Sequence, residues 1–213
     1  MVVFPLGAAV VAAAFAFQTW RVSQPSDVAL RVWAIALAQF AAGCLALAWG
    51  VASGWTPLVY RVYYLFGAVL NVAWLGLGTI WLEAPRKVAA VCNVVFIVAA
   101  TGASGIVMGT ELVEGADRAL ELQTLPAPKD VMADLPRLMS RVFSILGSSI
   151  VLLGVFSSIV RRRHMLGLGL LALGVVVAAL SSEFARAGDV ALFSLGLCAG
   201  IALMYTGFLR TRS

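Results

Sequence analysis

The chain has 213 residues, of which 62% are hydrophobic and 12% are charged, and its formal net charge is +5. A soluble domain is about 45–50% apolar and about 25% charged, so this composition excludes an ordinary water-soluble fold and indicates a lipid bilayer as solvent. The basic residues are scattered at the ends of apolar segments, as in membrane proteins, and this distribution argues against a nucleic-acid partner.

Seven stretches are long and apolar enough to cross a bilayer, which takes roughly 20 residues per helix. We therefore expect an all-α, polytopic membrane protein with a single domain over residues 1–213. We also expect a multi-pass location in the cell membrane, that is, in a bacterial inner or plasma membrane. The predicted transmembrane helices are 2–17, 28–52, 58–82, 88–110, 136–160, 165–182 and 190–209.

Only one sizeable segment is predicted to lie outside the membrane, at residues 111–135. Its first half, Glu111–Leu122, has helical periodicity and predicts a short helix lying on the membrane surface. The apolar face of that helix would hold Leu112, Ala116, Ala119 and Leu120. Earlier in the chain, Asp27 precedes the second apolar stretch and is a candidate helix N-cap.

The distribution of charge predicts which way the helices run through the membrane. With the N-terminus outside and the C-terminus inside, the inner side carries a clear excess of basic residues, as the positive-inside rule requires. The basic residues placed inside are Arg21, Arg31, Arg86, Lys87, Arg161, Arg162, Arg163, Arg210 and Arg212, against the acids Asp27 and Glu83. Most of the acidic residues placed outside fall in the 111–135 loop.

The third apolar stretch carries the most polar and aromatic pattern of the chain. Aromatic, amide and glycine residues alternate at spacings of three and four, which puts them on one helical face in the bundle interior. They are Tyr60, Tyr64, Gly67, Asn71, Trp74 and Gly78. Asn71 lies near mid-membrane, where it either bonds another helix, with Gln39 as candidate partner, or faces a ligand.

Small residues recur on one side of three other stretches. In lipid, small residues let helix backbones approach closely and gain van der Waals contact, so these stripes predict helix packing in a compact bundle. They comprise Ser140, Ser144, Gly147, Val151, Gly154 and Ser158; Gly102, Gly105 and Gly109; and Gly196 with Gly200.

Four ionisable residues near the apolar stretches are predicted to lie at one level, the outer membrane boundary: Arg61, Arg141, Glu183 and Arg186. One interpretation is that they are snorkelling anchors with an Arg–Glu pair. The other is an outward-facing pocket for an anionic group such as a lipid headgroup or a carboxylate. The surrounding aromatics are then either its wall or an interfacial belt: Trp55, Tyr60, Tyr63 and Tyr64.

The scarcity of reactive groups argues against several familiar membrane functions. The lysines Lys87 and Lys129 lie in a turn and a loop, which argues against a retinal pigment. The single histidine, His164, lies in a basic turn, which argues against b-type haem. No His/Asp/Glu cluster suggests a metal site, and no carboxylate falls in mid-membrane for proton coupling. We expect no cofactor, no metal and no catalytic residue, and interpret Cys44, Cys92 and Cys198 as buried packing residues.

Part of the third stretch and its flanks resembles a pattern in small, uncharacterised seven-helix membrane proteins of high-GC bacteria. The pattern is Gly54-Trp55, then Tyr60-Arg61-x-Tyr63-Tyr64-x-x-Gly67, then Trp74-x-Gly76-x-Gly78, then Pro85-Arg86. The resemblance implies a seven-helix topology and no particular activity.

These observations favour a non-enzymatic binding module, receptor-like or accessory, with an outward-facing site for a lipid or another ligand. Its partners would be membrane lipids, an amphiphilic or anionic ligand, and a membrane protein. A small transporter or transporter subunit is a second hypothesis, and a lipid-modifying enzyme acting at the outer surface is a third. The candidate ligand-binding residues are Tyr60, Arg61, Tyr64, Asn71, Trp74, Arg141 and Glu183.

Overall fold

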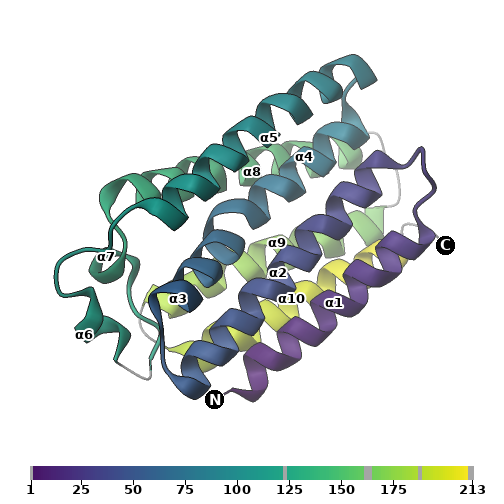
Figure 1. Ribbon diagram of the computed structural model, residues 1–213. Helices are drawn as coiled ribbons and strands as arrows, with labels where there is room; N and C mark the ends of the chain where they lie inside the picture. Colours follow the sequence, from purple (N-terminus) through teal and green to yellow (C-terminus); the bar gives the residue numbers. More distant parts are fainter. Residues whose placement is uncertain (1, 122–123, 161–164, 187–188, 211–213) are drawn as a thin grey trace.

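The computed structural model describes residues 2–121, 124–160, 165–186 and 189–210, and over these residues the fold is all-α (Figure 1). The long helices run roughly side by side, with the two chain termini at opposite ends of the bundle. The elements are α1 (Val3–Val22), α2 (Val28–Ser53), α3 (Pro57–Tyr63), the π-helix η1 (Tyr64–Leu70), α4 (Asn71–Glu83), α5 (Arg86–Gly109), α6 (Ala116–Leu120), α7 (Pro128–Val131), α8 (Asp134–Val160), α9 (Met165–Arg186) and α10 (Val190–Arg210).

Five helical segments within the described residues are long and apolar enough to cross a membrane: Val3–Val22, Val28–Ser53, Pro57–Glu83, Arg86–Gly109 and Asp134–Ser157. The third of them is the continuous succession of α3, η1 and α4. In addition, α9 and α10 have 22 and 21 residues. The all-α prediction is confirmed, and the apolar helices are those expected of a membrane protein.

The first helix is longer than predicted, because it continues to Val22 through the polar residues after residue 17. Two contacts explain the extension: Thr19 is buried against the bundle, and the Tyr205 hydroxyl donates a hydrogen bond to Gln18. Asp27 is the N-cap residue of α2, as predicted, but its side chain makes no capping hydrogen bond to the helix. The carboxylate of Asp27 instead accepts a hydrogen bond from the backbone N–H of Gln24 in the preceding turn.

Six of the long helices form a closed ring. Going round it, α1 packs on α2, α2 on α4, α4 on α8, α8 on α9, α9 on α10, and α10 returns to α1. The first and last long helices of the chain are therefore neighbours, as Figure 1 shows for α1 and α10. This closure puts the interior of the ring in contact with residues from both ends of the sequence.

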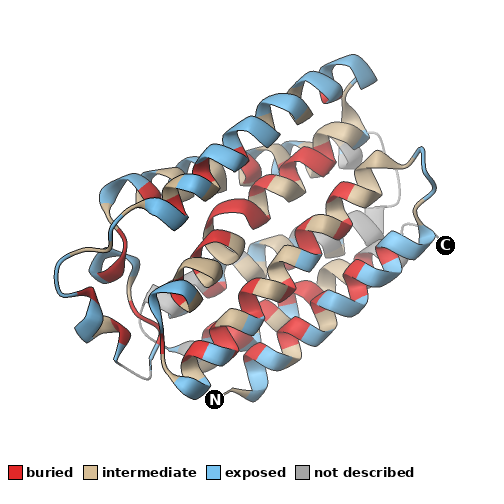
Figure 2. Ribbon diagram, in the orientation of Figure 1, coloured by how far each residue is buried: buried red, intermediate tan, exposed pale blue. Residues whose placement is uncertain are grey.

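Helix α5 lies outside the ring, against α3, η1, α4 and α8. Its outer surface is exposed along almost its whole length (Figure 2), and beyond the basic first turn most of the exposed side chains are apolar, including Val91, Val94, Val95 and Val98. An exposed apolar helix of this kind is stable when lipid surrounds it.

Two of the predicted small-residue stripes are packing surfaces, as expected. On α8, a Cβ atom at Gly147 would lie 2.6 Å from the carbonyl oxygen of Val72, so α8 and α4 meet backbone to backbone. On α10, a Cβ at Gly200 would lie 2.8 Å from the carbonyl oxygen of Gly174 on α9. Close backbone approach at small residues is the usual source of van der Waals attraction between helices in lipid.

The third stripe behaves differently, and its predicted packing role is wrong among the described residues of this chain. A Cβ atom at Gly102, Gly105 or Gly109 would meet nothing within 4 Å. These glycines lie on α5, which stands outside the ring and leaves most of its surface without a helix neighbour.

The third apolar stretch is interrupted by the seven-residue π-helix η1. A π-helix has more residues per turn than an α-helix, so it rotates the residues that follow it relative to those before it. The expected single face is therefore wrong: Gly67 lies against Gly43 of α2, whereas the Trp74 ring packs on Phe96 of α5, with ring centroids 4.9 Å apart. Gly78 returns to α2, where it lies under the indole of Trp33.

The loop 111–135 folds back onto the bundle. Val113 donates a backbone hydrogen bond to Val131 at 3.1 Å, which ties the two arms of the loop together. The predicted surface helix is reduced to the five residues of α6. Two residues of its apolar face, Ala116 and Leu120, are buried in the same apolar cluster as Trp55 and Tyr60, so this face packs on protein rather than on lipid.

Candidate functional site

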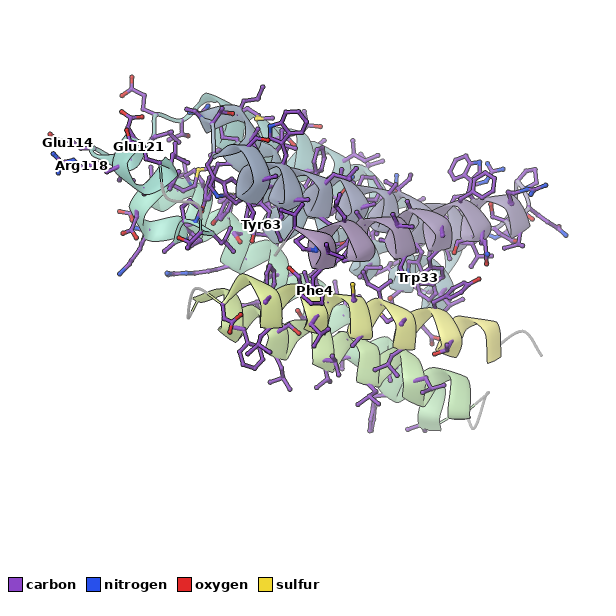
Figure 3. All side chains as sticks on the ribbon, turned by 90° about the horizontal axis from the view of Figure 1, so that it is seen from below. Phe4, Trp33, Tyr63, Glu114, Arg118 and Glu121 are labelled. Carbon is purple, nitrogen blue, oxygen red and sulfur yellow. The ribbon has the colours of Figure 1, made fainter. Side chains whose placement is uncertain are left out.

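A cluster of four aromatic residues lies where the 111–135 loop meets the bundle. The ring centroids of Trp55 and Tyr60 are 5.6 Å apart, those of Trp55 and Tyr63 are also 5.6 Å apart, and those of Tyr60 and Tyr64 are 6.2 Å apart. Figure 3 shows Tyr63 on the same half of the molecule as the loop residue Glu114. The predicted aromatic residues do gather, and they gather beneath the loop.

The polar atoms of this cluster hold the loop in place. The indole N–H of Trp55 donates to the carbonyl oxygen of Thr124 at 2.9 Å, and the Tyr60 hydroxyl donates to that of Pro126 at 3.1 Å. Both side chains are buried, and Tyr60 has no exposed surface. Buried polar atoms need partners, and here loop carbonyl groups satisfy them.

Arg61 lies at the C-terminal end of α5. Its guanidinium donates hydrogen bonds to the carbonyl oxygen of Met108 and, at 2.8 Å, to that of Thr110. The last carbonyl groups of a helix lack partners within the helix and carry a partial negative charge, so a cation is favourable there. Arg61 thus closes α5 and joins it to α3.

The mid-bundle residues Asn71 and Trp74 follow η1 directly. Asn71 is buried. The expected hydrogen bond with Gln39 is not formed through the Gln39 amide oxygen, because that buried atom has no partner among the described residues. The indole N–H of Trp74 likewise has none. Asn71 and Trp74 line neither of the two cavities considered below.

A separate groove of about 410 Å³ runs along the first turns of α8. Its walls are Asp134, Leu135, Arg137, Leu138 and Arg141. Arg137 is half-buried and pairs with the carboxylate of Asp134, whereas Arg141 is exposed and makes no ion pair in the described part of the chain. Among the described residues, Arg141 is therefore the arginine of the groove that has no carboxylate partner.

The helix that carries the groove also contacts the segment that carries Tyr64. Ser140 of α8, next to Arg141, donates a hydrogen bond to the carbonyl oxygen of Ala68 in η1, the π-helix that begins at Tyr64. Of the predicted ligand-binding residues, the structure thus brings Tyr60, Arg61 and Tyr64 together beneath the loop and places Arg141 in the adjoining groove. Glu183 belongs to α9, and its side chain lies outside the described part of the chain, as does the turn with His164.

Two residues of this groove, Asp134 and Arg137, are absent from the candidates chosen from the sequence. The available signal was the spacing of Arg137 and Arg141, since residues four apart share a face of a helix. Asp134 and Pro136 are also residues typical of a helix start, a role that needs no ligand.

The described residues hold no group of three or more His, Cys, Asp or Glu side chains placed to bind a metal ion. Cys44, Cys92 and Cys198 are free thiols. Comparison with protein-family models, curated proteins and solved structures found no match to this chain. The case for function therefore depends on the geometry of the chain itself.

Proposed function

We propose that this chain is a seven-span protein of the cell membrane that binds an anionic phospholipid at its outward-facing end without transforming it. The lengths of α9 and α10 support the two further spans, because each has about the number of residues that a bilayer crossing needs. The excess of basic residues at the end of the bundle away from the 111–135 loop supports an orientation with the N-terminus outside and the C-terminus inside.

The groove on α8 carries the proposal. Arg137 and Arg141 lie one helical turn apart, and two leucines beside them are exposed: Leu135 by 47% and Leu138 by 51%. A phospholipid presents the same combination, with a negatively charged headgroup next to an apolar chain. Lysine or arginine near a membrane surface contributes about 1 kcal/mol each to the attraction of anionic lipid.

The exposed surface of α8 continues this site along the membrane. Below the groove, the exposed apolar side chains Val142, Ile145 and Leu146 follow one another along the helix. An acyl chain could lie along them while the headgroup stays at the arginines. All five lining residues of the groove belong to the first turns of α8, so a single helix places the arginines and the leucines side by side.

Lipid retention tests this proposal. We expect the purified protein in nanodiscs of mixed phosphatidylglycerol and phosphatidylcholine to retain phosphatidylglycerol selectively when analysed by native mass spectrometry. Replacing Arg137 and Arg141 together by glutamine should lower that selectivity roughly tenfold or more, since about 2 kcal/mol of attraction is removed. Arg118→Gln is the matched control, because it removes an exposed arginine of the loop outside the groove.

A gain-of-binding variant makes the test sharper. Asp134 neutralises part of the charge of Arg137, so Asp134→Asn should increase selectivity for phosphatidylglycerol. Equal retention of both lipids by the unaltered protein, or equal loss in Arg118→Gln and the double variant, would contradict the proposal.

A further inference from the structure

At the end of the bundle away from the 111–135 loop, a cavity of about 80 Å³ lies inside the six-helix ring. Its walls come from α1, α2, α4, α8, α9 and α10, that is, from every helix of the ring. Figure 3 shows Trp33, one of its lining residues, at the opposite end of the molecule from the loop residues Glu114 and Arg118. The cavity is thus distinct from the groove on α8.

The walls of the cavity become more polar toward the end of the helices. On α1, Phe15 lies deeper and Thr19 one turn nearer the helix end; on α4, Leu75 lies deeper and Thr79 one turn nearer the end. The lining also runs from Phe15, which is 5% exposed, to Leu82, which is 56% exposed. The cavity is therefore mainly apolar and opens to the bundle surface beside Leu82, with Thr19 and Thr79 among its few polar lining residues.

One buried polar group in the wall of the cavity is unsatisfied. Thr19 is 1% exposed, and its hydroxyl has no hydrogen-bond partner among the described residues. Other helical hydroxyls in this chain bond the carbonyl one turn back, as Thr79 does to Leu75 at 3.0 Å and Ser181 to Val177 at 2.6 Å. Rotation of the Thr19 side chain between staggered positions exchanges its methyl and hydroxyl groups, which can present the hydroxyl to the cavity.

The apolar lining of the cavity limits the kinds of ligand. Most of its walls are aliphatic or aromatic side chains, and the carboxylate of Glu83 at its edge accepts a hydrogen bond from the Ser157 hydroxyl at 3.0 Å. A charged ligand group such as a carboxylate would lose its hydration on entering this apolar space, and that loss is costly. The volume is roughly five to eight times what one water molecule needs, and an apolar cavity of this kind favours hydrocarbon over water.

From this geometry we infer that the cavity binds the end of an uncharged amphiphile, with its apolar tail toward Phe15 and Leu37 and a hydroxyl oxygen hydrogen-bonded to Thr19. The ligand class is a long-chain alcohol or an acylglycerol, not a fatty acid. This inference does not depend on the phospholipid groove, since the two sites share no residue and use different chemistry.

Fluorescence quenching of Trp33 provides the test, because the Trp33 ring forms part of the wall. The probes are a bromoalkanol, the matching bromoalkanoate and the matching bromoalkane, added to the protein in detergent micelles. The component due to Trp33 is the difference between the unaltered protein and Trp33→Phe. We expect saturable quenching of that component by the bromoalkanol, with weaker binding of both other probes.

Two variants distinguish the contribution of the Thr19 hydrogen bond to probe binding from the contribution of the cavity volume. Thr19→Val removes the hydroxyl with little change of shape and should weaken bromoalkanol binding roughly three- to tenfold, while bromoalkane binding stays the same. Val155→Phe fills the cavity and should abolish saturable binding of every probe. If Val155→Phe does not give a monodisperse protein, Leu75→Phe replaces it, because it fills the same cavity from another helix.

Quenching with no Trp33 component would overturn the inference. Equal affinity for the bromoalkanol and the bromoalkane, or affinity for the bromoalkanol that is unchanged in Thr19→Val, would overturn it too. Tighter binding of the bromoalkanoate would exclude the proposed ligand class.

Discussion

Gly147 of α8 lies against the backbone of Val72 in α4, so closely that a Cβ atom would stand 2.6 Å from the Val72 carbonyl oxygen. A backbone atom cannot move aside as the end of a flexible side chain can. The contact joins α4 to the helix that carries the arginine groove, and the same two helices also line the cavity.

We predict that Gly147→Ala destabilises the protein by about 1–3 kcal/mol, the usual cost of inserting a methyl group into a closely packed contact. Gly105→Ala is the control, because a Cβ there meets nothing within 4 Å. Reversible unfolding in mixed micelles, followed by circular dichroism, measures both. Equal stability of the two variants would show that α4 and α8 do not approach this closely.

The π-helix η1 is supported by two serines of α8. Ser140 and Ser144 both donate to the carbonyl oxygen of Ala68, at 3.0 and 3.2 Å. Because either serine can replace the other, each single alanine variant should cost less than about 0.6 kcal/mol. The double variant leaves the carbonyl with no serine donor and should cost about 1–1.7 kcal/mol, more than the sum of the single variants. A double-mutant cycle, measured by the same unfolding experiment, tests this expectation. If the free-energy changes of the two single variants simply added up in the double variant, the two serines would not share this carbonyl.

The Tyr60 hydroxyl holds the loop through Pro126, so Tyr60→Phe should loosen the loop while leaving the aromatic packing in place. We expect faster amide hydrogen exchange at Val113, whose N–H bonds Val131 across the loop, with unchanged exchange in α2. Tyr63→Phe is the matched control, because the Tyr63 ring belongs to the same cluster and no hydrogen bond joins it to the described part of the loop. Identical amide exchange at Val113 in both variants would show that the Tyr60 hydroxyl does not hold the loop.

Arg61 is expected to act as a helix cap, a role different from ligand binding. Arg61→Met should cost about 1.5–3 kcal/mol of stability through loss of charged hydrogen bonds to the Met108 and Thr110 carbonyl groups. Arg61→Lys keeps the charge and should recover part of that loss. The selectivity for phosphatidylglycerol should stay the same in both variants. If an Arg61 variant lost selectivity for phosphatidylglycerol without losing stability, Arg61 would have to be assigned to the lipid-binding site.

Cysteine labelling tests the orientation. In a variant with Cys44, Cys92 and Cys198 replaced, a cysteine at the exposed position 114 should react with a membrane-impermeant maleimide added to intact cells. A cysteine at the exposed position 87 should react only after the membrane is opened. The reverse pattern would place the N-terminus inside.

Several features of the fold follow directly from residue order. The lengths of the apolar stretches predicted where the long helices lie. For α2, the predicted and observed bounds differ only at Ser53. Small residues on α8 and α10 predicted where backbones meet, because lipid offers no other reason to place glycine there. The same reasoning was wrong for the glycines of α5. A row of small residues makes close approach of another helix possible, but the position of the helix in the bundle decides whether a neighbouring helix is there.

The candidate site shows the same division. The sequence by itself determined that charged and aromatic side chains gather near the loop end, because such residues are placed at membrane boundaries by the cost of burying charge in hydrocarbon. Only the tertiary structure decided their partners. The hydroxyl of Tyr60 and the guanidinium of Arg61 are used by carbonyl groups 66 and 47 residues away in the chain, and no local pattern encodes such pairs. The cavity beside Thr19 likewise exists only because ring closure brings α1 against α10, which is a property of packing and not of residue order.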